Sequence, residues 1–337
     1  MTRTSIREWV PRLGVVAAGI LFAGSVHAQS VKIGVQTGLG YLPLQVMVHD
    51  QLLLKHAQQL GLNDVKPEIV TFSNAGAMND ALLSHSIQYA SGGVSTFLTL
   101  WSKAGGSSAV KAAGGLVSMP MYLNTRSSSV KTIRDFGQKD RIGVAGVKVG
   151  YQAILLQMAA AQAFGEKNYA RLDPLTVTIS NPDGLLVLSN PRSEINTHFA
   201  PPPYAQRELK IKGVHTVLKS YDILGGPATL DEVWSTAKFR DANPKLHQAF
   251  VAALKESMDR INADRSHAAD VYLKMSGDKT PKSAILEQLN DSDIQYSIVP
   301  SRTMAIADFM RKIGSIKKPF RSWRDFHFEE IAAMPGS

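Results

Sequence analysis

The 337-residue sequence contains no cysteine. Without a thiol, the chain cannot form a disulfide scaffold, a cysteine-ligated zinc site, an iron–sulfur cluster, a cysteine nucleophile or a thioether lipid anchor. Walker-type phosphate loops and the His-Glu-x-x-His and Gly-x-Ser-x-Gly motifs are also missing, and the nine histidines are dispersed. We therefore expect a protein that is not an enzyme, with no catalytic residues, no metal and no cofactor.

Long apolar runs and clusters of one charge are missing as well. After the first 28 residues, no stretch of about 18 apolar residues occurs, so we expect no stable membrane insertion. The 37 basic and 28 acidic residues give a net charge of +9, but the basic residues are scattered, which argues against a nucleic-acid partner. Hydrophobic residues make up 44% of the chain, enough for two globular domains.

The first 28 residues have the pattern of an export signal. Arg3, Arg7 and Arg12 are followed by an uncharged, mostly apolar run over 13–26, which is shorter than the roughly 20 residues that span a bilayer. Small residues stand at Val26 and Ala28, where signal peptidase requires them. The pattern predicts cleavage after Ala28 and an exported protein.

Short strand patterns alternate with longer helical patterns along the rest of the chain. We expect one helix over 42–60, a strand over 87–90, a short helix over 132–136 and a long helix opening at Asn243 and Pro244. Because parallel strands need a crossover that a helix supplies, this alternation favours parallel sheets covered by helices. The predicted fold class is α/β with two lobes. The first is formed by 29–118 and 225–337 and the second by 119–224, with hinge crossings near 119–122 and 221–227.

Ligands of open α/β sheets bind beyond the carboxyl ends of the strands, where helix N-termini converge. This rule selects the segments 36–41, 73–74, 92–96, 147–152 and 196–204. Free N–H groups at helix starts can hold an oxyanion, and Lys148 would add a full charge. Tyrosines and a phenylalanine could form an aromatic wall. The candidate ligand-binding residues are Gln36, Thr37, Gly38, Tyr41, Asn74, Gly93, Ser95, Thr96, Tyr122, Lys148, Gly150, Tyr151, Gln152, His198, Phe199 and Tyr204.

Several of these residues also have simpler interpretations. Asn74 can be an ordinary helix cap, Lys148 a solvated charge, and each aromatic residue a packing group. The Gly38-Leu39-Gly40 segment also suggests a dinucleotide loop, but Pro43 occupies the place of the third glycine, which argues against that site.

The element order, the segments Gln36–Pro43 and Ser91–Thr96, and the run His198-Phe199-Ala200-Pro201-Pro202-Pro203-Tyr204 resemble periplasmic substrate-binding proteins of ABC importers. The likeness is greatest to the nitrate, sulfonate and taurine branch. Gln88 and Asn196 depart from the family pattern, since they replace acids that would point toward the cleft ends of strands. The resemblance implies a type 2 periplasmic binding protein with a ligand cleft between its lobes.

The resemblance further implies a monomeric periplasmic receptor that delivers a small anion, such as a sulfonate, taurine or nitrate, to an ABC permease with its ATPase. An alternative is a receptor for a flat heterocycle or aromatic acid of the pyrimidine-precursor type. A less favoured alternative is an exported enzyme on the same fold. The pyrimidine synthases of that fold rely on a cysteine-rich iron motif, which a chain without cysteine cannot form.

Overall fold

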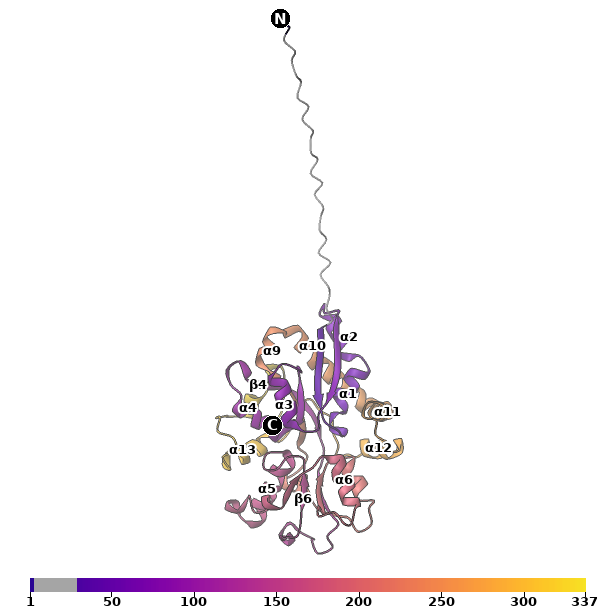
Figure 1. Cartoon of the computed structure of the whole chain (residues 1–337), viewed down its shortest axis with the longest axis vertical. Coiled ribbons are helices and arrows are strands. Elements are labelled where there is room, and N and C mark those ends of the chain that lie inside the picture. Colours follow the sequence, from indigo (N-terminus) through magenta and orange to yellow (C-terminus); the bar gives the residue numbers. More distant parts are fainter. Residues whose placement is uncertain (3–28) are drawn as a thin grey trace.

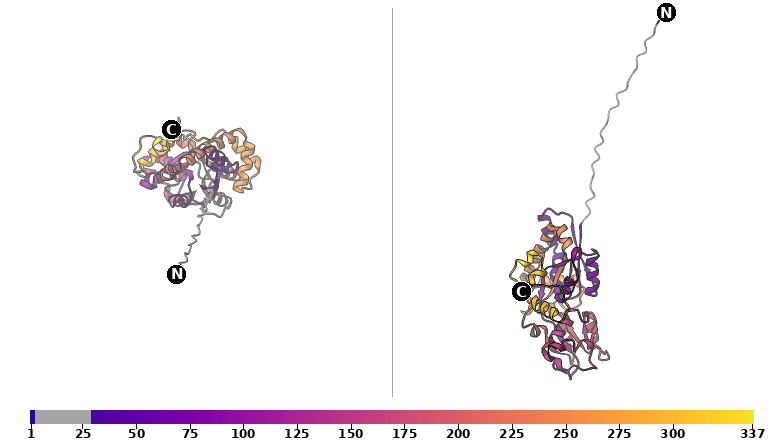
Figure 2. Two further views of the ribbon diagram at one scale, coloured as in Figure 1. Left: turned by 90° about the horizontal axis from the view of Figure 1, so that it is seen from above. Right: turned by 90° about the vertical axis from the view of Figure 1, so that its left-hand side faces the viewer.

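A computed structural model describes residues 1–2 and 29–337. The expected signal peptide, including its cleavage site, lies outside the described residues. The remaining chain forms two lobes, one above the other in Figure 1, and the right-hand view of Figure 2 shows the second lobe below the first. Within 29–337, none of the helices combines the length and the hydropathy that a membrane span requires.

The first lobe opens with a parallel strand pair. Strand β1 (Gln29–Val35) runs beside β2 (Val65–Thr71), with Ile33 opposite Ile69. The connection contains α1 (Leu42–His49) and α2 (Leu52–Gln59) rather than the single helix predicted over 42–60. The chain breaks at Gln51, whose φ of 56° lies in the left-handed region. No glycine or proline marks this break, so the sequence prediction was wrong here.

A second sheet of the first lobe joins segments far apart in the sequence. Strand β10 (Thr229–Thr236) lies between β3 (Ala90–Gly93) and β4 (Val110–Ser118) and is antiparallel to both. The predicted strand over 87–90 therefore begins three residues later. The expectation of purely parallel sheets was wrong, because the chain returns from the second lobe through β10. Helices α3 (Ala75–Leu83) and α4 (Val94–Lys103) complete this part.

The second lobe contains one five-stranded sheet in the order β7-β6-β8-β5-β9. Strand β6 is parallel to β7 and β8, whereas β5 is antiparallel to β8 and β9. The short helix predicted over 132–136 is a single 3-10 turn, Ile133–Asp135. The strands are β5 (Tyr122–Thr125), β6 (Ile142–Val144), β7 (Thr176–Thr178), β8 (Thr197–Ala200) and β9 (His215–Lys219). The helices are α5 (Tyr151–Phe164), α6 (Asn181–Ser189), α7 (Tyr204–Glu208) and α8 (Ser220–Leu224).

The C-terminal third is helical and packs mainly on the first lobe. Helix α10 begins at Pro244, as the sequence predicts, and its apolar face packs on α1 and α2. These helices are α9 (Ala237–Ala242), α10 (Pro244–Ala263), α11 (Arg265–Ser276), α12 (Lys282–Leu289), α13 (Thr303–Lys312) and α14 (Glu329–Ala332). The exact lobe boundaries and hinge crossings stay a prediction.

Ion pairs around Glu256 tie α10 to α2. One carboxylate oxygen of Glu256 lies 2.8 Å from Lys55 Nζ and 2.7 Å from His56 Nε2, and the other accepts from Arg260 at 2.9 Å. The hydrogen bond from Lys55 is the largest cause that lowers the pKa of Glu256, to about 2. The ionised carboxylate is thus more favourable in the folded chain than in the unfolded chain.

We expect Glu256→Gln to lower the free energy of unfolding by about 1 kcal/mol at pH 7, since partly solvated pairs contribute modestly. The difference in unfolding free energy between the variant and the unsubstituted protein should have its full value above the ordinary glutamate pKa of 4.5. It should disappear as pH falls toward about 2. Urea unfolding of both proteins at a series of pH values measures this difference in the free energy of unfolding. A difference that persists unchanged at pH 2.5 would contradict the assignment.

Candidate functional site

A cavity of about 490 Å³ lies between the two lobes. Its walls come from the loop after β1, the starts of α3, α4, α5 and α6, the loop after β8, and β10. Met119 and Met121, in the segment between β4 and β5, also line it. Most of the lining residues therefore lie at the carboxyl ends of strands or at the helix starts that follow them, as expected for an open α/β sheet, whereas Leu230 and Asp231 lie at the amino end of β10.

The helix starts differ in how their backbone N–H groups are used. The Asn74 side chain caps α3 by accepting from the N–H of Ala77 at 2.9 Å. Helices α4 and α5 begin after Gly93 and Gly150 and have no side-chain cap. Uncapped N–H groups at the positive end of a helix dipole are available to an oxygen acceptor on a ligand.

The starts of α4 and α5 lie against each other across the two lobes. A Cβ added to Gly93 would lie 2.7 Å from the Tyr151 Cβ, so this close approach requires glycine. The Ser95 hydroxyl donates to the Val149 carbonyl at 3.2 Å. Beside this contact, the Gln152 amide accepts from the Ala145 N–H and donates to Asn181. The cavity wall is thus continuous from one lobe to the other.

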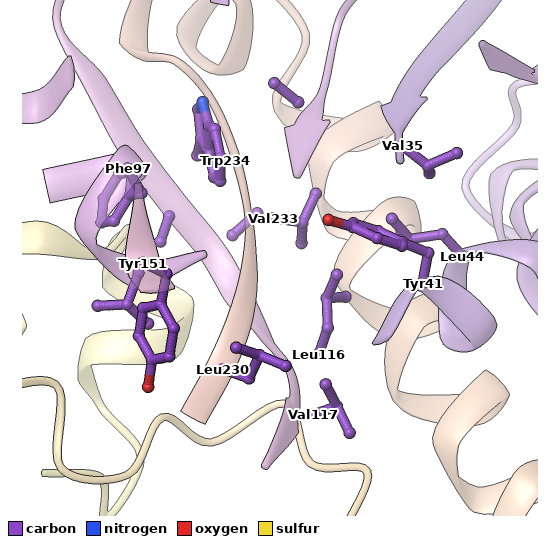
Figure 3. Close-up of a cluster of buried hydrophobic side chains, with 14 of the residues drawn as sticks. Val35, Tyr41, Leu44, Phe97, Leu116, Val117, Tyr151, Leu230, Val233 and Trp234 are labelled. Carbon is purple, nitrogen blue, oxygen red and sulfur yellow. The ribbon is translucent and has the colours of Figure 1, made fainter. Parts of the chain in front are cut away.

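Most of the residues selected from the sequence meet in this cavity, although no ligand is present to test their roles. They come from loops that are up to about a hundred residues apart in the chain. The selected residues that line the cavity are Gln36, Thr37, Gly38, Tyr41, Asn74, Gly93, Thr96, Gly150, Tyr151 and Gln152. Figure 3 shows the two lining tyrosines, Tyr41 and Tyr151, on either side of β10.

The remaining selected residues lie outside the lining. Ser95 is engaged with Val149, as described above. Lys148 is exposed, and its charge opposes the rise that burial causes in the pKa of Asp173. The ammonium group of Lys148 is therefore not part of the cavity wall, although the sequence led us to expect that it binds an anion there. Among the described residues, the cavity lining includes no lysine, arginine or histidine.

The other four belong to the second lobe. Phe199 is a fully buried core residue, and Tyr122 stacks under the Lys219 ammonium at 5.0 Å. His198 is fully buried and lies 2.5 Å from Glu208. Burial raises the pKa of Tyr204, and the side chain of Thr37 in the first lobe opposes this rise. From the run 198–204, it is Pro201 and Pro202 that line the cavity.

Gln88 and Asn196 do not face the cleft ends of their strands. Both precede a strand, and each side chain accepts from a backbone N–H, Gln88 from Lys32 at 2.8 Å and Asn196 from Arg141 at 3.2 Å. Neither residue lines the cavity. In this chain both positions precede their strands, β3 and β8, and their side chains bind backbone N–H groups instead.

Sequence reasoning missed Asp231, which lines the cavity from β10. Only 6% of this residue is exposed, and burial raises the pKa of its carboxyl to about 7. The signal was available, since Asp231 and Glu232 are adjacent acids between the apolar residues of one strand, Leu230 before them and Val233 and Trp234 after them. Other lining residues that were missed are Asn79, Thr99, Met119, Met121, Thr178 and Asn181.

No protein-family model matches the sequence, and no curated protein matches it. Solved structures do resemble the chain. The periplasmic aliphatic sulphonate-binding protein SsuA from Escherichia coli has a TM-score of 0.65 and 17% identity, over 91% of this chain and 99% of SsuA. The periplasmic nitrate-binding protein NrtA from Synechocystis PCC 6803 has a TM-score of 0.67 and 13% identity, over 86% of this chain and 82% of NrtA.

A third similar structure is the Candida albicans CA3427 gene product, described as having the generic periplasmic binding protein fold. Its TM-score is 0.62 at 12% identity, over 86% of this chain and 92% of that one. These likenesses extend over both lobes and confirm the fold class predicted from the sequence. The chain has the two-lobed fold of periplasmic binding proteins.

Proposed function

We propose that this protein is the exported, periplasmic ligand-binding component of an ABC-type importer, and that it binds a small molecule between its lobes. The observation that carries the proposal is the cavity itself, about 490 Å³ in volume and walled by helix starts and strand ends of both lobes. Cavities of this size suit a small molecule rather than a polymer. SsuA and NrtA, which resemble the chain, are binding proteins by name.

The mechanism that this geometry supports is binding by closure. A ligand that contacts both lobes favours the closed arrangement by its difference in affinity for the closed and open forms. The uncapped N–H groups of α4 and α5 supply acceptor-binding positions, one from each lobe. The closed ligand-bound shape is then what a permease with its ATPase would recognise.

The test is a thermal-shift screen of the purified protein against taurine, alkanesulfonates, nitrate, bicarbonate, aromatic carboxylates and pyrimidines. We expect a saturable rise in melting temperature with one compound class, because ligand that binds only the folded chain stabilises it. Calorimetry on each positive compound gives its affinity. The proposal fails if no compound binds and the protein purified from the periplasm carries no small molecule.

Filling the cavity should abolish this binding. Thr96 lines the wall at the start of α4, and we expect Thr96→Trp to weaken binding of the positive compound at least 100-fold while the protein stays folded. The matched control is Ser107→Trp, at an exposed position outside the cavity, which should bind as the unsubstituted protein does. Equal affinity of Thr96→Trp and the control would place the ligand elsewhere.

A further inference from the structure

Asp231 is an acidic group without a partner in the wall of the cavity. Its strand, β10, lies in the middle of the first lobe's second sheet, and the residue is 94% buried. In the described part of the chain, its carboxyl makes no hydrogen bond and no ion pair within the usual distance limits. Its oxygens are not fully enclosed but reach the cavity, so a ligand bound there can supply the partner that the chain does not.

Two phenols near this carboxyl donate their hydrogen bonds to other groups. The Tyr41 hydroxyl donates to Gln36 Oε1 at 3.3 Å, and the Tyr151 hydroxyl donates to the Thr229 carbonyl at 3.2 Å. These two phenols, from the turn before α1 and from α5, are the titratable groups that face Asp231 across the cavity wall. The next residue, Glu232, is buried on the opposite face of β10, where it lies 3.4 Å from His327.

Gly40 leaves space for the carboxyl group of Asp231. A Cβ added to Gly40 would lie 2.1 Å from Asp231 Oδ2, so any side chain at position 40 would collide with the acid. Glycine at position 40 therefore leaves the space that this carboxylate oxygen occupies beside the cavity. A carboxyl that is largely removed from solvent in a cavity wall is a candidate ligand-binding group.

We infer that Asp231 binds a cationic N–H group of the ligand, so that the ligand is a small amine or a protonated amino-heterocycle rather than a plain anion. The inference rests on the proposed function. An acceptor group on the same molecule would bind the N–H groups at the starts of α4 and α5. Aminosulfonates and aminopyrimidines meet this description, whereas nitrate and unsubstituted alkanesulfonates do not.

Calorimetry with matched probe pairs tests the inference. Taurine is compared with isethionate, which carries a hydroxyl in place of the amine, and 4-aminopyrimidine with 4-methylpyrimidine. We expect the amine of at least one pair to bind 10-fold or more tightly than its partner. Asp231→Asn should remove this preference, because a neutral amide offers no charge to the cation. Asp173→Asn, which removes a half-buried carboxyl outside the cavity, should retain it.

The number of protons released or taken up when the ligand binds gives a second test. Because burial raises the pKa of Asp231 to about 7, taurine, whose amine already carries its proton at pH 7, should release protons when it binds and ionises this carboxyl. An aminopyrimidine is neutral at pH 7 and would receive its proton from Asp231 itself, so this readout applies to taurine. A bound anion should instead cause proton uptake. Calorimetry in two buffers of different ionisation enthalpy gives the sign. Binding without preference for the amine, or binding of taurine with proton uptake, overturns the inference and leaves the receptor function intact. Failure of every compound to bind, with no small molecule retained on purification, overturns both.

Discussion

Replacing Asp231 with asparagine is expected to stabilise the folded protein at pH 8 by up to about 4 kcal/mol, and to stabilise it progressively less as pH falls toward 4. The residue is 94% buried, and burial raises the pKa of its carboxyl from 3.8 to about 7. A difference of one pKa unit between the folded and unfolded states corresponds to about 1.4 kcal/mol, so ionised Asp231 lowers the free energy of unfolding.

The sign follows from which state holds the proton. Between pH 3.8 and about 7, the folded chain retains the proton of Asp231 while the unfolded chain has released it. Stability therefore falls as pH rises through this window and stays low above it. Asparagine does not titrate, so the advantage of the variant is full above pH 7 and small near pH 4.

Urea unfolding of both proteins at pH 4.5, 6 and 8 measures this dependence. The exposed carboxyl of Asp64 offers a control, since solvent hydrates it in both states and Asp64→Asn should change stability by less than about 0.5 kcal/mol. A gain from Asp231→Asn that is the same at all three pH values would show that charge burial is not its cause. Higher stability together with weaker amine binding is the trade-off typical of a functional residue.

Truncating Glu208 is the change expected to destabilise the second lobe most. One of its carboxylate oxygens lies 2.5 Å from His198 Nδ1, and the other accepts from Asn124 Nδ2 at 3.0 Å. All three side chains are fully buried. Removing Glu208 leaves His198 Nδ1 buried without its partner, whereas Asn124 still donates to the Ala205 carbonyl. We expect Glu208→Ala to cost about 3 to 5 kcal/mol.

The tryptophans allow the two lobes to be followed separately. Trp101, Trp234 and Trp323 are the tryptophans of 29–337, and all are buried in the first lobe. In Glu208→Ala, circular dichroism should detect unfolding at lower urea than tryptophan fluorescence does. Glu194→Ala, at an exposed position of the second lobe, is the control. A cost below 1 kcal/mol for Glu208→Ala would contradict the role given to this pair.

The sequence predicted the strand ends that form the cavity better than it predicted the side chains that face it. The starts of α4 and α5 were recognised from local patterns, because helices that follow buried strands place their N–H groups at one sheet edge. His198 and Phe199 were misplaced because they lie within strand β8, whose side chains pack into the second lobe, whereas the prolines beyond the strand reach the cavity.

The missed features depend on contacts between distant parts of the chain. Strand β10 pairs with β3 and β4 in the first lobe, although about 110 to 140 residues separate it from them in the sequence. No local sequence pattern predicts this pairing. Only this placement brings Asp231 to the cavity and against Gly40. Lys148 was favoured because it carries a charge, but in the fold the neighbours Val147 and Val149 line the cavity instead.

The cavity wall is divided between the lobes, with α3, α4 and β10 on one side and α5 and α6 on the other. Neither side holds the complete set of contacts. A molecule that is too short can touch only one side and gains nothing from closure, and a molecule that is too long keeps the sides apart. The protein would therefore select its ligand by length as well as by charge, because only a ligand of the right length contacts both lobes at once.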